Sequence, residues 1–218
     1  MTGTEQDRLT AAADAYHAAT FNGDASGIEP AERGLDALDA LDAQVALARG
    51  RLRHVRAMAA GADDPEEIAL FQRAEAGFQA LGDTAGEAEA AFWIGCYHQV
   101  IQHDDDTAMP ALQRSADLAH HARAGVIRSY ALRHLGIHAH RKGRLDDAQA
   151  MLEESTSLRR DAGFDAGVAA NLVGLAYIAI EDGRPFDAVD FLDEADTLSA
   201  GSGADAVTAQ AAEARTRL

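Results

Sequence analysis

The 218-residue sequence has one cysteine, four prolines and no long apolar run. The lone Cys96 excludes a disulfide within the chain and favours a reducing compartment. Few prolines and no alternating Val/Ile-rich segments are typical of an all-α chain. No stretch approaches the ~18 apolar residues of a membrane span, and the acidic N-terminal segment lacks the apolar core of a signal peptide. We therefore expect a cytoplasmic, all-α protein.

Basic residues are also scarce, with 19 Lys and Arg against 36 Asp and Glu, a net charge of −17. Nucleic-acid binding requires a basic surface that replaces condensed counterions, so this charge argues against nucleic acid and against anionic membranes. The one basic run lies at 49–56 inside an expected helix. We expect it to be a solvated face paired with Asp36, Asp39 and Asp42.

The sequence does contain an internal repeat with a period of 40 residues. Residues 135–158 and 175–198 align without a gap, with nine identities in 24 positions. An upstream copy matches the positions of Ala148, Leu152 and Ser155 and has one extra residue in its turn near 104–106. A more degenerate copy covers about 38–81. Periods of 20–50 residues are typical of stacked repeat architectures.

Helical periodicity and end signals predict ten helices. Asp64-Pro65 predicts a capped helix start, residues 84–87 predict a capping box opened by Thr84, and Gly143 and Gly183 predict left-handed helix ends. A loop rich in Asn and Gly precedes residue 31. The predicted helices are 4–20, 31–60, 65–81, 84–102, 107–122, 126–142, 145–161, 166–182, 186–199 and 203–217.

Leu135-Gly136, with Ala148 twelve residues after the glycine and Leu152 four later, resembles the tetratricopeptide repeat family. The period exceeds the usual ~34 residues, and the closing proline is absent. The resemblance implies a right-handed superhelical stack of antiparallel hairpins over 31–200, after an N-terminal helix and loop (1–30) and before a capping helix (201–218). It also implies a non-enzymatic adaptor or scaffold. Its concave groove would bind a peptide, a partner helix or a second copy.

In register, the first helices of the hairpins line that groove with aromatic, polar and charged side chains, a composition suited to binding. Packing between repeats is the alternative role for the apolar members. The candidate groove residues are Phe92, Cys96, Gln99, Tyr130, Arg133, Ile137, His140, Arg141, Tyr177 and Glu181.

The alternative function is a metal-binding or small-molecule sensor, or a biosynthetic accessory protein, that uses the same groove or a histidine-rich edge. His134 and His138 lie one helical turn apart, a spacing that can hold a metal. The repeat register places His98 and His103 near His138 and His140. No metal-binding or catalytic motif frames them, so we expect no cofactor and no catalytic residue.

Overall fold

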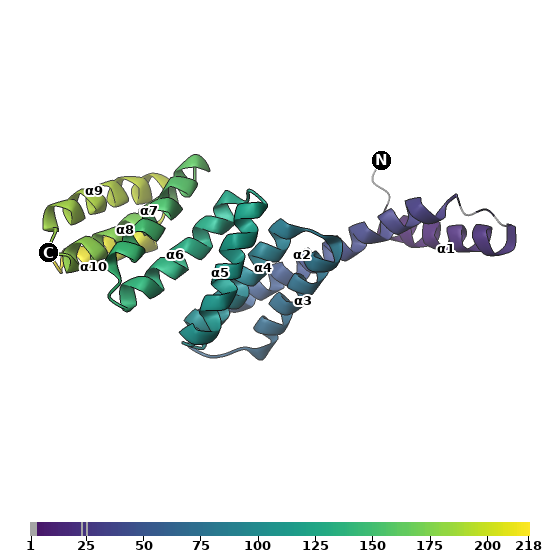
Figure 1. The fold of residues 1–218 in the computed structure, drawn as a ribbon, viewed down its shortest axis with the longest axis horizontal. Coiled ribbons are helices and arrows are strands. Elements are labelled where there is room, and N and C mark those ends of the chain that lie inside the picture. Colours follow the sequence, from purple (N-terminus) through teal and green to yellow (C-terminus); the bar gives the residue numbers. More distant parts are fainter. Residues whose placement is uncertain (1–3, 23, 25) are drawn as a thin grey trace. The chain divides into compact units, whose positions relative to one another are not determined.

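A computed structural model describes residues 4–22, 24 and 26–218, and every regular element within them is a helix, with no strand (Figure 1). This confirms the all-α prediction. The chain divides into two compact units, Met1–Glu87 and Ala88–Leu218. The division at 30 and 200 stays a prediction, and the loop expected before residue 31 falls partly on residues 23 and 25, outside the described part. No described helix has the length and apolar content to cross a membrane.

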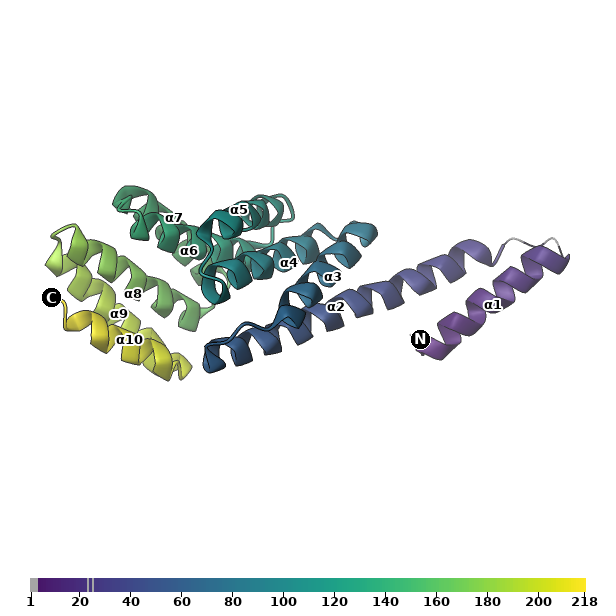
Figure 2. The ribbon, with the colours of Figure 1, turned by 90° about the horizontal axis from the view of Figure 1, so that it is seen from below.

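The first unit contains α1 (Glu5–Asn22), α2 (Ile28–Ala60) and α3 (Pro65–Leu81). α1 lies beside the start of α2 (Figure 2), and α3 packs along its later part. Gly50 on α2 permits the close approach of Phe71, because a Cβ there would lie 2.5 Å from that ring. The predicted cap at Asp64 is confirmed, with its carboxylate accepting from the backbone N–H of Glu66.

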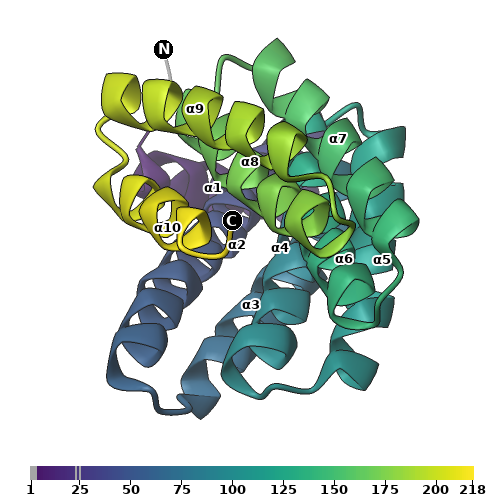
Figure 3. The same cartoon turned by 90° about the vertical axis from the view of Figure 1, so that its left-hand side faces the viewer.

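α4 (Thr84–Cys96) continues into a π-helical turn, η1 (Tyr97–Ile101), and leads to six helices that begin every 20 residues, so that alternate helices begin 40 residues apart. Figure 3 shows the last three, with α9 and α10 beside α8. The constant spacing means that equivalent sequence positions begin equivalent helices. The six are α5 (Asp105–His121), α6 (Gly125–Arg141), α7 (Leu145–Asp161), α8 (Asp165–Glu181), α9 (Pro185–Ser202) and α10 (Asp205–Arg215).

The core of the second unit follows the same interval. Leu112, Leu152 and Leu192 are at most 1% exposed, which confirms their predicted burial. Leu152 of α7 fits between Gly136 of α6 and Gly174 of α8. The absence of a side chain at both glycines therefore sets how closely α6 and α8 approach α7.

The turns between these helices use left-handed backbone. Gly143 and Gly183 have φ of 71° and 72°, as predicted. His103 occupies the matching position with φ of 55°. The extra residue expected near 104–106 lies earlier, because Gly95 is eight residues before His103 whereas Gly136 is seven before Gly143. The π-helical turn takes it up, since such a turn holds one residue more than an α-helical turn.

Two helix starts differ from the prediction. α4 is capped by Asp83, whose carboxylate accepts from the backbone N–H of Gly86, so the capping box opened by Thr84 is wrong by one residue. α2 begins at Ile28 rather than at 31. Pro30 then falls in the first turn, where its missing N–H costs no helical hydrogen bond.

Candidate binding face on α6 and α8

Six of the predicted groove residues lie together on α6 and α8, and we call them the α6–α8 face. Polar contacts join the two helices there. The Arg133 guanidinium donates to the Ala170 carbonyl oxygen (2.8 Å) and to Asn171 Oδ1 (3.0 Å). The His140 ring nitrogen lies 2.7 Å from Glu181 Oε2. The face comprises Tyr130, Arg133, Ile137, His140, Tyr177 and Glu181. Glu181 is exposed and the other five are partly buried.

Three predicted groove residues on α4 and η1 are not on a surface. Phe92, Cys96 and Gln99 are 4%, 2% and 4% exposed, so their assignment to an open groove is wrong. α6 covers them. The Phe92 ring stacks on Tyr130, with centroids 5.4 Å apart, and Cys96 Sγ lies 3.6 Å from His134 Nε2. Their role in this structure is packing between helices.

Two predicted groove residues, Gln99 and Arg141, have polar partners on neighbouring elements. The Gln99 amide donates to the His134 carbonyl oxygen (3.3 Å), and its Oε1 lies 2.6 Å from His134 Nδ1. Arg141 is exposed but donates to Asp105 Oδ1 at 2.9 Å. The Arg141 side chain is thus engaged at the start of α5 and is not part of the α6–α8 face.

A buried arginine that the sequence analysis missed lies beneath this face. Arg159 of α7 is 3% exposed and donates to the Gly167 carbonyl oxygen (2.7 Å) and to Ser129 Oγ (3.2 Å). Its guanidinium carbon lies 5.2 Å from the Tyr130 ring centre and 5.6 Å from that of Phe164. Both distances are within the range of a cation–π interaction, so the Arg159 guanidinium helps to orient the Tyr130 ring.

Arg159 and Arg133 form no ion pair with any residue in the described part of the chain. Burial, followed by repulsion from Arg133, lowers the pKa of Arg159 to about 10. Burial also lowers the pKa of Arg133. Nothing in the sequence distinguishes Arg159 from its neighbour Arg160, which pairs with Glu194 at the surface. The face therefore carries positive charge that no carboxylate neutralises.

The four metal-ligand candidates do not gather into one site. His134 contacts Gln99 and Cys96, and His138 Nδ1 lies 3.1 Å from Asp105 Oδ2. The His98 ring packs against Tyr97, while His103 is exposed in the turn. Across residues 4–22, 24 and 26–218, no three His, Cys, Asp or Glu side chains are grouped to hold a metal ion. The expected proximity of His98 and His103 to His138 and His140 stays a prediction.

Comparison with known proteins adds no assignment. No protein-family model matches the chain, and no curated protein matches it.

Proposed function

We propose that this protein is a non-enzymatic, tetratricopeptide-like interaction module, a cytoplasmic adaptor or regulatory scaffold. In this proposal its hairpins stack into a right-handed superhelix, and the α6–α8 face binds a peptide or a helix of a partner protein. The 40-residue recurrence of helix starts and of buried leucines supports the repeat interpretation.

The composition of the α6–α8 face is the observation that carries the proposal. Tyr130, Ile137 and Tyr177 offer partly exposed apolar area, and Arg133 adds a guanidinium without a carboxylate partner in the described chain. Tyrosine and arginine are enriched among residues that dominate binding energy at protein interfaces. Arg217 extends this pattern, with its guanidinium carbon 5.1 Å from the Tyr177 ring centre.

Preorganisation supports binding by the same residues. Hydrogen bonds to Ala170 and Asn171 already hold the Arg133 side chain, and Phe92, Phe164 and Arg159 already hold the Tyr130 ring. A partner would then lose little additional side-chain entropy on binding. We expect the bound segment to place an apolar side chain near Ile137 and a carboxylate or carbonyl oxygen near Arg133.

Site-specific photo-cross-linking tests this function. A photoreactive amino acid replaces Ile137 on the face in one variant and Phe186 in a control. Phe186 is 85% exposed on α9 and lies outside the face. In the cells that naturally express the protein, we expect one defined protein to cross-link at 137 and not at 186. No adduct at 137, or the same adducts at both positions, would contradict the proposal.

A further inference from the structure

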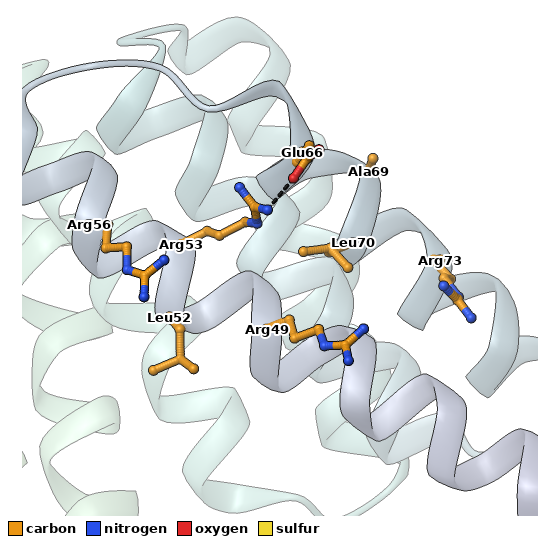
Figure 4. A pocket seen from close by; sticks show the side chains of 8 residues that line it. All are labelled: Arg49, Leu52, Arg53, Arg56, Glu66, Ala69, Leu70 and Arg73. Atoms are coloured by element: carbon orange, nitrogen blue, oxygen red, sulfur yellow. Dashed lines mark ion pairs between the residues drawn. The ribbon is translucent and has the colours of Figure 1, made fainter.

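A second surface lies within the first unit, where α2 and α3 border an open hollow of about 480 Å³ (Figure 4). Four arginines surround it, although the chain as a whole is strongly acidic. Leu70 points into the space between the two helices. We call this site the α2–α3 hollow. Its lining residues are Arg49, Leu52, Arg53, Arg56, Glu66, Ala69, Leu70 and Arg73.

Two of these arginines form ion pairs and two do not. Arg53 pairs with Asp64 (2.6 Å) and with Glu66, and Arg73 pairs with Asp42 (2.5 Å). The exposed Arg49 and Arg56 form no ion pair with any residue that the structure describes.

The sequence expectation that Asp36, Asp39 and Asp42 neutralise the basic run is therefore wrong. Asp42 pairs with Arg73 of α3 instead. Asp42 also precedes Arg49 by seven residues, or about 10 Å along a helix, which is too far for an ion pair on one face. Two unpaired cations remain beside the hollow.

Apolar side chains lie between these cations. Leu52, which lies between Arg49 and Arg56 on α2, is 66% exposed. Leu70 and Ala69 add apolar surface from α3. A small anion would neutralise the arginines but would leave this apolar surface in contact with water, which is unfavourable. The site is better matched by a partner that has both anionic and apolar groups.

The spacing of the groups specifies that partner further. Arg49, Leu52 and Arg56 occupy positions i, i+3 and i+7 of α2, so the two arginines are about 10 Å apart along the helix. A helix with Glu at i, Leu at i+4 and Glu at i+7 presents carboxylates at the same separation, with an apolar side chain between them. We propose that the α2–α3 hollow binds an acidic amphipathic helix of a partner protein. This site is separate from the α6–α8 face, and the inference does not depend on the function proposed for that face.

Fluorescence anisotropy with a defined probe tests the proposal. The probe is a fluorescein-labelled, alanine-based peptide of about 20 residues, long enough to form a helix, containing Glu-Ala-Ala-Ala-Leu-Ala-Ala-Glu. We expect the full chain to bind it at low salt and more weakly as salt rises. The double substitution Arg49→Gln/Arg56→Gln should weaken binding roughly tenfold. Leu52→Asn should also weaken it, and its exposed position makes loss of folding an inadequate explanation, which circular dichroism verifies.

The matched control is Arg33→Gln/Lys142→Gln, which removes the same net charge at exposed positions outside the hollow. It should change affinity by no more than about twofold, because screened charges at a distance contribute little. Absence of binding by the wild type, or equal losses in both double variants, overturns the proposal. Displacement by inorganic phosphate without any effect of Leu52→Asn assigns the arginines to a small anion instead. A wild-type dimer in sedimentation velocity that Arg49→Gln/Arg56→Gln dissociates assigns the hollow to a second copy, and also overturns it.

Discussion

The contact between Gly136 and Leu152 gives a sharp test of the packing described above. An alanine Cβ at position 136 would lie 2.5 Å from Leu152 Cδ1 and 3.3 Å from the Ala148 carbonyl oxygen. Leu152 has little room to move away, because on its other side it packs against Gly174 so closely that no side chain would fit between them. Overpacking of this kind costs about 1–3 kcal/mol. Alanine regains about 1 kcal/mol of helix propensity over glycine, so Gly136→Ala should lower the free energy of unfolding by up to about 2 kcal/mol.

Gly201→Ala is the matched control, since Gly201 is also helical and a Cβ there meets no atom within 4 Å. It should leave stability unchanged or raise it by up to about 1 kcal/mol. Leu152→Ala alone should cost about 2–5 kcal/mol. Combined with Gly136→Ala it should cost less than the sum, because the new methyl group partly fills the vacated space. Denaturant unfolding followed by circular dichroism measures all four variants. A Gly136→Ala protein as stable as Gly201→Ala would refute the reasoning.

Four further predictions concern other parts of the chain. Burial raises the pKa of Glu67, which lies 2.7 Å from His54, above its usual 4.5. The unfolded chain therefore loses this proton first, and stability falls as pH rises through the folded-state pKa. The free energy of unfolding of Glu67→Gln, relative to that of the wild type, should therefore increase as pH rises above about 4.5. A stability difference between the two proteins that does not change with pH would contradict this. Arg123 has φ of 54°, so Arg123→Gly should raise the thermal midpoint by relieving up to about 1 kcal/mol of strain, and a lowered midpoint would count against it. Cys96 is 2% exposed, so Ellman's reagent should label it at least roughly tenfold more slowly in the native than in the unfolded protein, and equal rates would show that it is accessible. Elemental analysis of the purified protein should find no stoichiometric transition metal, and one ion per chain would favour the sensor alternative.

Helix positions and core leucines could be predicted because local rules determine them. A glycine that adopts the left-handed backbone conformation just after a helix commonly ends that helix, as Gly143 and Gly183 do. The stripe through Ala148 and Leu152 recurs at helical spacing, so its burial follows from the sequence pattern. The π-helical turn could not be located in this way. Its extra residue is evident from the alignment, but η1 takes it up before His103 and not in the turn at 104–106.

The candidate site was predicted only in part, because a helical face does not reveal which neighbour covers it. Phe92 and Cys96 lie on a face of α4 that α6 covers. Ile137 lies on a face of α6 that stays partly open to solvent. The register also does not show which groups each histidine contacts. His134 packs against Gln99 and Cys96, and His138 lies beside Asp105. Arg159 was missed because only the tertiary contacts with Tyr130 and Phe164 distinguish it from Arg160.

The central claim, that the α6–α8 face binds a protein partner, is tested most directly by calorimetry with the protein that cross-links at position 137. Tyr177→Ala should weaken its binding by about 1–3 kcal/mol while leaving the helix content unchanged. Phe186→Ala, which removes a more exposed aromatic side chain outside the face, should leave the affinity unchanged. Equal affinities of wild type and Tyr177→Ala, or a loss confined to Phe186→Ala, would contradict the claim.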